Sequence, residues 1–346
     1  MAVNGYGTIG RRVADAILRQ PDMELVGVTK ATPDYRIDEA QQKGIRVFSV
    51  NGSKNLTDAG YTVEGNLNDM LQECEVVVDC SPKHKGKENL AIYSAYPKLK
   101  VIFQGGEKHE LTGFSFNSDC NYEQAVGRNV VRVVSCNTTA LCRIISTLNT
   151  SYQIRKVRAT LVRRSADQSE SEQCLMNAWQ PDMSFPSHHG IDVRTVMPGI
   201  NITSLAGIAP MTLMHGQMLF IELENSSRPA AAAGVAETLS QNPRIIMCSS
   251  KSGLTTTAKL KDFFALNGRN GNIFEVCLWK EGIGVDDSGE IGLHMAIDQQ
   301  ADVVPENIDA IRAMFDLMPA EESIATTNAA LGIGKAIKKL AYVRGE

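Results

Sequence analysis

Residues 1–20 read MAVNGYGTIGRRVADAILRQ, a short strand-like start followed by a helix-like pattern from residue 8. Between them, Gly5, Gly7 and Gly10 match the pattern G-x-G-x-x-G. In such a loop the first glycine permits a tight turn, the second lets backbone approach a pyrophosphate, and the third lets the helix pack closely. The helix N-terminus then offers N–H groups to phosphates. The stretch therefore predicts a dinucleotide site, and the alternative is a glycine-rich turn without a ligand.

The rest of the chain predicts two kinds of sheet. Apolar runs separated by crossover-sized segments indicate a parallel, doubly wound sheet, and they lie at 24–30, 76–81, 100–106 and 128–136. Longer strand patterns follow and predict an α+β domain with a mixed or antiparallel sheet, at 156–167, 203–224, 244–250, 272–286 and 290–300. Helical patterns close the chain at 304–318 and 326–342. We therefore expect an α/β Rossmann domain followed by an α+β domain.

Composition narrows the class of protein. The 346 residues are enough for two domains, and 43% hydrophobic with 21% charged residues is ordinary for a globular chain. A net charge of −4 leaves no broad basic field, so neither nucleic acid nor a membrane is expected as a partner. The eight cysteines form no C-x-x-C pair, so no metal site is expected. Scattered thiols and the lack of a leader-like start indicate the cytoplasm.

The end of the second predicted strand bears on the nucleotide. NAD enzymes often place an acidic residue there to hold the ribose 2′-hydroxyl. Here the strand ends in Thr29-Lys30, and a lysine suits a 2′-phosphate. This favours NADP as cofactor over NAD. The alternatives are a solvated lysine at position 30, and Asp34 serving the ribose of NAD.

Cys136 lies where a predicted strand meets a predicted helix, in the stretch VVSCNTTALCR. A thiol at a helix N-terminus has a lowered pKa, because the helix dipole stabilises the thiolate. A nucleophilic cysteine needs this. The pattern alone leaves a second interpretation open, since cysteine is also a common small buried residue.

Several motifs occur together in an order and spacing that resemble one family. They are NGYGTIGRRVADAI, FQGGEK, VVSCNTTALCR, VRATLVRRSADQ, PSHH, TLMH and VVPENIDAIRA. Over nearly the whole chain they resemble the archaeal type of phosphorylating glyceraldehyde-3-phosphate dehydrogenase. The resemblance implies a Rossmann domain at 1–137, a catalytic domain at 138–302, and C-terminal helices at 303–346 that pack back on the first domain. It also implies a homotetramer acting in glycolysis and gluconeogenesis.

The resemblance assigns roles to single residues. Cys136 would attack the aldehyde of glyceraldehyde 3-phosphate, and His215 would hold the thiolate and act as general base. Inorganic phosphate would then cleave the thioester. Substrate or phosphate contacts are implied for Ser135, Asn137, Thr138, Arg163, His188 and His189. Cofactor contacts are expected from the glycine motif for Gly5, Gly7 and Gly10 and from the strand end for Lys30. The resemblance implies further cofactor contacts for Thr8, Ile9, Gly105, Gly106 and Gln299, and places Arg164 near the cofactor or a phosphate.

The chain departs from the family pattern in two places. Its first strand is short, and we expect this to affect stability and not chemistry. Gly216-Gln217-Met218 follows His215 where related sequences carry a second histidine, so His215 is the candidate in this stretch.

Two other functions remain open. One is a cysteine-dependent semialdehyde or acyl-phosphate reductase of the same design, although the arginine and histidine pairs favour a phosphorylated substrate. The other is a regulator that binds a nucleotide or RNA, which the negative net charge disfavours.

Overall fold

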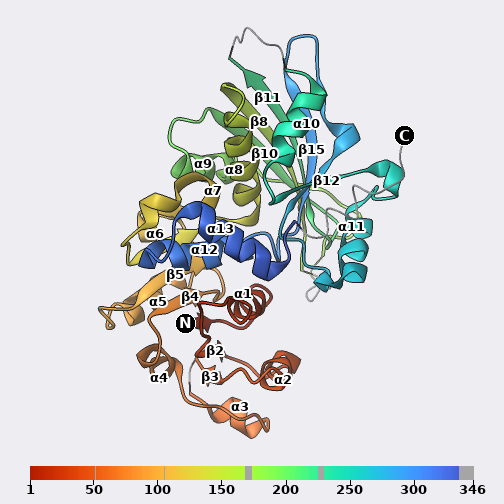
Figure 1. The fold of residues 1–346 in the computed structure, drawn as a ribbon. Helices are drawn as coiled ribbons and strands as arrows, with labels where there is room; N and C mark the ends of the chain where they lie inside the picture. The colour runs from red at the N-terminus through yellow and green to blue at the C-terminus, as the bar shows by residue number, and fades with distance from the viewer. Residues whose placement is uncertain (51, 105, 168–173, 225–229, 335–346) are drawn as a thin grey trace. The chain divides into compact units, whose positions relative to one another are not determined.

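The computed structural model describes residues 1–50, 52–104, 106–167, 174–224 and 230–334. The chain divides into two compact units. Met1–Ser135 and Val303–Leu331 form the first unit, and Cys136–Asp302 with the described residues after Leu331 forms the second. Figure 1 labels helices and strands of both units along the chain.

A seven-stranded, entirely parallel sheet is the centre of the first unit, in the order β3-β2-β1-β4-β5-β7-β6. Its strands are β1 (Ala2–Asn4), β2 (Gly27–Lys30), β3 (Val47–Ser49), β4 (Val76–Asp79), β5 (Lys100–Gln104), β6 (Ser115–Phe116) and β7 (Val130–Val133). The predicted doubly wound sheet is confirmed. β3 and β6 were missed, because strands of three and two residues carry no clear pattern. The strand order reverses between β1 and β4, which is where such sheets bind ligands.

Helices and one 3-10 turn complete the first unit. They are α1 (Gly10–Ile17), α2 (Tyr35–Gln42), α3 (Lys54–Asp58), α4 (Leu67–Gln72), α5 (Gly86–Tyr93), α6 (His109–Thr112), α7 (Ser118–Asn121), η1 (Tyr122–Ala125), α12 (Val304–Phe315) and α13 (Ala320–Leu331). The helix predicted at 326–342 therefore starts earlier and ends at Leu331. Residues 335–342 of that prediction lie outside the described residues.

Arg312 of α12 is completely buried, and its guanidinium is paired on every side. Nε and Nη2 donate to the two carboxylate oxygens of Asp22 at 2.8 and 2.7 Å. Gln20 and Thr327 accept further hydrogen bonds at 2.8 and 2.6 Å. Because a buried charge is tolerated only when it is paired and hydrogen-bonded, this cluster fixes α12 to α13 and to the segment after α1.

A mixed sheet forms the second unit, in the order β12-β13-β15-β11-β8-β10-β9, with β14 paired to β15. Its strands are β8 (Ile154–Arg164), β9 (Gln180–Pro181), β10 (Ile202–Ala209), β11 (His215–Leu223), β12 (Ile245–Cys248), β13 (Val276–Trp279), β14 (Gly284–Val285) and β15 (Ile291–Ile297). β8 pairs with β10 in parallel and with β11 antiparallel, which confirms the predicted mixed sheet.

The helices and turns of this unit are α8 (Cys136–Asn149), α9 (His188–Val196), α10 (Ala232–Ser240), η3 (Ser250–Ser252), α11 (Thr257–Phe264), η4 (Ala265–Arg269) and η5 (Lys280–Gly282). The strand predicted at 272–286 is wrong as one element, since the turn η5 separates β13 from β14.

The long strand predicted at 203–224 is also wrong, because the chain breaks at Pro210 and turns before His215. Proline has no N–H for a sheet ladder, so a strand ends there. β10 and β11 lie on opposite sides of β8, so the segment between them passes around the carboxyl end of β8. There the N–H of Ser165 donates to the carbonyl of Met211 at 3.0 Å. This crossing sets His215 beside the last residues of β8.

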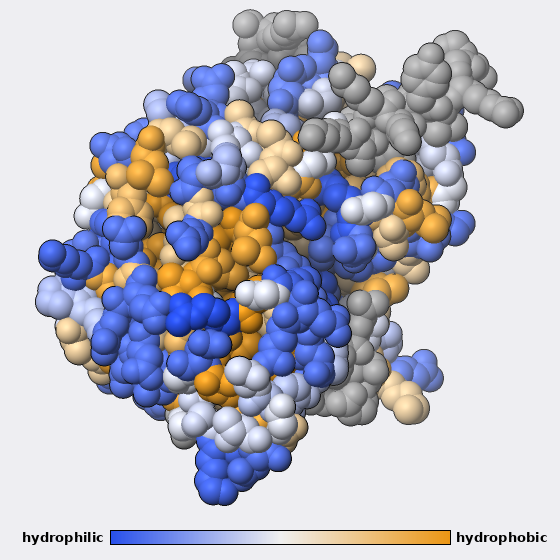
Figure 2. Space-filling view, turned by 60° about the horizontal axis from the view of Figure 1, so that its bottom comes forward, coloured by the Kyte–Doolittle hydropathy of each residue, from blue (hydrophilic) through white to orange (hydrophobic). Residues whose placement is uncertain are grey.

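The face drawn in Figure 2 is covered mostly by hydrophilic side chains, with a group of apolar side chains near its middle. Within the described residues, no helix combines the length and apolar character that crossing a membrane requires.

Candidate functional site

The glycine-rich loop follows β1 at the point where the order of the first sheet reverses. Gly5 has φ +102°, and a Cβ there would lie 2.8 Å from the carbonyl oxygen of Cys80. A Cβ on Gly10 would collide with the carbonyl oxygen of Gly5. A Cβ on Gly7 would meet nothing within 4 Å. Two of the glycines are therefore required by the fold, and the third leaves room for a ligand beside the backbone.

The backbone N–H groups of this loop divide into used and available donors. The N–H of Gly5 donates to Thr29 Oγ1 at 2.8 Å, and that of Gly7 to the carbonyl of Gly5 at 2.9 Å. Among the hydrogen bonds of the described residues, none uses the N–H of Thr8, Ile9 or Gly10. These groups precede and open α1, where a phosphate is favoured by the helix dipole. The contacts expected at Thr8 and Ile9 fit this arrangement.

A buried hydrogen-bond chain supports the loop from below. Tyr93 donates to Asp79 at 2.8 Å and accepts from Asn4 Nδ2 at 2.7 Å. Asn4 Oδ1 accepts from the hydroxyl of Thr29 at 2.6 Å, and Thr29 accepts from the N–H of Gly5. Because an ionised carboxylate only accepts, Asp79 fixes the donor direction of every later bond. No sequence pattern indicated this series of hydrogen bonds, whose members come from β1, β2, β4 and α5.

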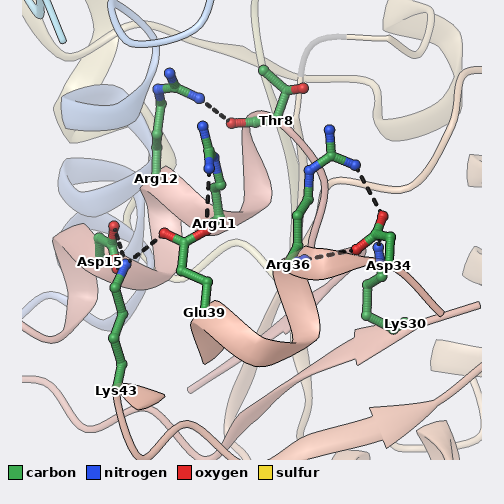
Figure 3. A network of polar contacts seen from close by, with 9 residues as sticks. All are labelled: Thr8, Arg11, Arg12, Asp15, Lys30, Asp34, Arg36, Glu39 and Lys43. Carbon is green, nitrogen blue, oxygen red and sulfur yellow. Dashed lines mark hydrogen bonds and ion pairs between the residues drawn. The ribbon is translucent and has the colours of Figure 1, made fainter. Parts of the chain in front are cut away.

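Lys30 lies at the end of β2, and only 8% of its side chain is exposed. Its Nζ lies 2.7 Å from a carboxylate oxygen of Asp34, as Figure 3 shows. The alternative of a solvated lysine is therefore wrong. Gly106 lies two residues after the end of β5, and its N–H donates to the carbonyl of Gln104 at 3.0 Å. Gly105 lies outside the described residues.

A second group of predicted residues gathers at one end of the sheet in the second unit. Arg163 and Arg164 end β8, and His215 begins β11, which runs antiparallel to it. β15 pairs its last residue with His215, so Gln299 follows at the same end. Cys136 begins α8 and His188 with His189 begins α9. Arg164 and Gln299, expected at the cofactor, thus belong to the second unit, and Ser135 is the last residue of the first.

Gln217 links the start of α8 to this end of the sheet, and it was not among the predicted site residues. Gln217 Nε2 donates to Asn137 Oδ1 at 2.8 Å, and both side chains are buried. His215 and Gln217 share one face of β11, because strand side chains alternate. This alternation was the available signal. Thr138, a predicted phosphate contact, is completely buried in the same helical turn.

The predicted acidity of Cys136 is wrong. Surrounding protein atoms raise the pKa of its thiol above the usual value, and the carboxylate of Asp302 raises it further. The N–H of Asn137, at the start of the helix, and the two arginines lower the pKa but do not outweigh burial. The helix terminus therefore lowers the pKa of the thiol as expected, but burial raises it more. Cys136 and Asp302 are the first and last residues of the segment Cys136–Asp302, so no local pattern indicated their interaction.

His215 is held in one tautomer by the backbone. Its Nδ1 accepts a hydrogen bond from the N–H of Arg164 at 3.0 Å. A backbone N–H can only donate, so Nδ1 carries no proton and the neutral ring carries it on Nε2. Burial, with the charges of Arg164 and Arg163, lowers the pKa of His215 to about 3. As placed, His215 is a neutral donor at Nε2.

Cationic and polar groups around this end suit an anion. The Nε atoms of Arg163 and Arg164 are buried and have no hydrogen-bond partner among the described residues. The same holds for both ring nitrogens of His189 and for Oε1 of Gln299. Burial, with His188, Arg163 and His215 nearby, lowers the pKa of His189 to about 2. Arg164 is partly neutralised by Asp167 at 2.9 Å, which also accepts from Gln300.

A glycine-rich loop in the first unit, with a cysteine, a histidine and two arginines in the second, is what a nucleotide-linked dehydrogenase requires. Residues 135–262 match the family model for the C-terminal domain of glyceraldehyde 3-phosphate dehydrogenase. Residues 1–120 match the model for the N-terminus of dihydrodipicolinate reductase. The chain belongs to the glyceraldehyde-3-phosphate dehydrogenase family, because full-length relatives share well over a third of its residues.

Three of these relatives are glyceraldehyde-3-phosphate dehydrogenases from archaea. The protein of Archaeoglobus fulgidus is 45% identical over 97% of this chain and 98% of its own length. That of Metallosphaera sedula is 44% identical over the same shares. That of Methanothermus fervidus is 43% identical over 96% of this chain and 98% of its own. The resemblance to the archaeal type is thereby confirmed, and the first unit is an NAD(P)-binding domain.

Proposed function

We propose that the chain oxidises glyceraldehyde 3-phosphate to 1,3-bisphosphoglycerate with inorganic phosphate, reversibly, in glycolysis and gluconeogenesis. The observation that carries this proposal is the grouping of Cys136, His215 and two arginines at one end of the second sheet. Family membership over nearly the full length supports it. NAD(P), when bound, accepts the hydride that the substrate carbon loses.

The reaction proceeds on Cys136. The thiolate form of Cys136, whose proton has passed to solvent, forms a bond to the aldehyde carbon, and the carbonyl electrons move to oxygen, giving the alkoxide of a thiohemiacetal. The Nε2–H of His215 donates to that oxygen as negative charge develops on it. Loss of hydride from the same carbon restores the carbonyl as a thioester. Phosphate then attacks the thioester carbon, and the sulfur of Cys136 leaves as thiolate.

The general-base role implied for His215 needs a lone pair on Nε2. That requires the proton to sit on Nδ1, where the N–H of Arg164 now donates. We therefore assign His215 the role of donor to the negatively charged oxygen formed in the first step. The alkoxide then expels hydride without a base. The base role belongs to the other tautomer.

The substrate carries one phosphate and the reaction consumes another, so two anion sites are needed. Arg163 and Arg164 offer forked donors, and each has one unpaired buried Nε. The neutral ring of His189 offers one N–H, and the ring of His188 lies tilted beside it, 3.9 Å away between ring centroids. Ser135, Asn137 and Thr138 complete the proposed substrate contacts through their position at the start of α8.

NADP is the proposed preferred cofactor, with NAD as the second. Lys30, buried at the end of β2, supplies the charge for the 2′-phosphate. Lys30→Ala should lower kcat/KM for NADP about tenfold, as expected for one lost charged hydrogen bond, and leave NAD nearly unchanged. Lys30→Asp should reverse the preference. Unchanged ratios in both variants would remove Lys30 from the cofactor site.

A homotetramer in the cytoplasm is proposed as well. Leu205 and Phe220 lie on β10 and β11 with about half of each side chain exposed, which suits burial against another copy. All eight cysteines are free thiols, as expected in a reducing compartment. Light scattering coupled to gel filtration tests the assembly, and cell fractionation tests the location.

The deciding experiment is NADP reduction by glyceraldehyde 3-phosphate, with and without inorganic phosphate. Strong dependence on phosphate supports the thioester route. Turnover without phosphate would mean that water cleaves the thioester, and no turnover would favour a semialdehyde or acyl-phosphate substrate. Cys136→Ser should abolish oxidation while NADP still binds, so retained turnover would overturn the mechanism.

A further inference from the structure

Three charged side chains form a compact group where β2 ends and α2 begins. Asp34 is the N-cap of α2, and its Oδ1 accepts from the N–H of Arg36 at 3.0 Å. Its Oδ2 lies 2.7 Å from Nζ of Lys30 and 3.1 Å from Nη1 of Arg36. Figure 3 shows both cations directed at this one carboxylate. Neither Asp34 nor Lys30 nor Arg36 is more than 27% exposed.

A second group of charged side chains lies beside this one. Lys43 lies 2.8 Å from both Asp15 and Glu39, and Glu39 also pairs with Arg11 at 3.1 Å. These two cations and two anions are neutral together, and Figure 3 also shows Arg12, whose guanidinium donates to the carbonyl oxygen of Thr8 at 2.6 Å. The group of Lys30, Asp34 and Arg36 instead has one positive charge in excess. Its charge therefore acts on whatever lies at the end of β2.

The two nucleotides differ at this place in one substituent only. A ribose 2′-hydroxyl is a donor, and the carboxylate of Asp34 is the acceptor it needs. A 2′-phosphate carries nearly two negative charges, which Lys30 and Arg36 attract and Asp34 repels. Asp34 is ionised at neutral pH, since contacts with Lys30 and Arg36 outweigh its burial and lower its pKa.

We propose that Asp34 sets the nucleotide ratio of this enzyme, holding Lys30 and Arg36 in place for a 2′-phosphate while retaining an acceptor for the 2′-hydroxyl of NAD. Arg36 is then a second specificity-determining residue beside Lys30. This inference rests on the proposed NAD(P)-dependent activity and on the end of β2 lying at the adenosine ribose.

Asp34→Asn is the direct test, because asparagine is an equally good N-cap and keeps the acceptor for the N–H of Arg36. The variant removes the charge, and its amide nitrogen takes the place of the oxygen that accepts from Lys30 and Arg36. We expect the NADP:NAD ratio of kcat/KM to rise about tenfold, the factor that corresponds to 1.4 kcal/mol. Arg36→Gln should lower the same ratio. Thermal unfolding of each variant verifies that α2 remains folded.

Asp38→Asn is the matched control. Asp38 lies in the first turn of the same helix and has the same charge, but its carboxylate contacts Tyr61 at 3.3 Å and not the two cations. The NADP:NAD ratio of kcat/KM in this variant should stay within about twofold of the ratio in the unmodified enzyme. If Asp38→Asn changes the ratio as much as Asp34→Asn does, the change in nucleotide preference comes from surface charge in general. That result would overturn the proposal.

The outcomes separate this inference from the function on which it rests. If Lys30→Ala lowers the NADP efficiency but Asp34→Asn leaves the ratio unchanged, the NADP site stands and the inference fails. If neither variant moves the ratio, the ribose does not lie at this end of β2 and both fail. Absence of dehydrogenase activity in the unmodified enzyme would reject the proposed function itself.

Discussion

Replacing Asp302 by asparagine should make the Cys136 thiol more acidic and more reactive. Burial is the largest cause of the raised thiol pKa, and Asp302 is the largest charge that raises it. Asp302 is completely buried, so solvent screens its charge poorly. Asparagine has nearly the same shape, and the main-chain carbonyl that accepts from Arg143 at 2.8 Å remains.

A like charge near a titrating group raises its pKa by about one to two units. Removing the charge would therefore increase the thiolate fraction at pH 7 about 10- to 100-fold. A less basic thiolate is also a weaker nucleophile, which cancels about half of the gain on a logarithmic scale. The expected net effect is a roughly 3- to 10-fold faster reaction of Cys136 with iodoacetamide.

The assay is the alkylation rate of Cys136 as a function of pH, with the site of labelling identified by mass spectrometry. Arg164→Gln should act in the opposite direction, because that charge lowers the thiol pKa. A variant that merely loosened the fold would speed labelling in both cases. An unchanged or slower rate in Asp302→Asn would refute the electrostatic account.

Three further predictions concern stability and positioning. Asp22→Ala should cost about 3–5 kcal/mol in the free energy of unfolding, because it leaves Arg312 buried and charged; urea denaturation measures this, and a loss below 1 kcal/mol would contradict it. His189 has a lowered folded pKa, so its neutral form contributes stability above pH 6.5 that is lost as the pH falls and the unfolded state takes up a proton. Between pH 7.5 and 5.5 the protein should lose about 1 kcal/mol more than the variant His189→Gln, and equal losses would disprove this. Tyr93→Phe should raise KM for NAD(P) while kcat is retained, since it removes the link between Asp79 and Asn4; steady-state kinetics with an unchanged KM would assign the tyrosine to stability alone.

Local signals predicted much of the fold and of the site. The glycine spacing located the phosphate loop, and the strand-to-helix transition located Cys136. Pro210 was a visible signal that the strand predicted at 203–224 had to break. The predictions failed where the property of a residue depends on groups that are distant from it in the sequence.

The acidity of Cys136 is the clearest such failure. A helix terminus is a local feature, whereas burial and Asp302 arise from the packing of the whole unit. Asp34 was identified as an alternative ribose contact, but its bonds to Lys30 and Arg36 depend on side-chain directions that no pattern gives. The tautomer of His215 depends on the register between β8 and β11.

The hydrogen bond from Arg164 to His215 has a consequence for how the enzyme tolerates mutation. Its donor is main chain, so every residue except proline at position 164 supplies the same N–H. A change of side chain at position 164 therefore leaves the proton of the neutral imidazole on Nε2. The tautomer of His215 is set by the pairing of two strands, whereas its pKa also depends on the charges of Arg163 and Arg164.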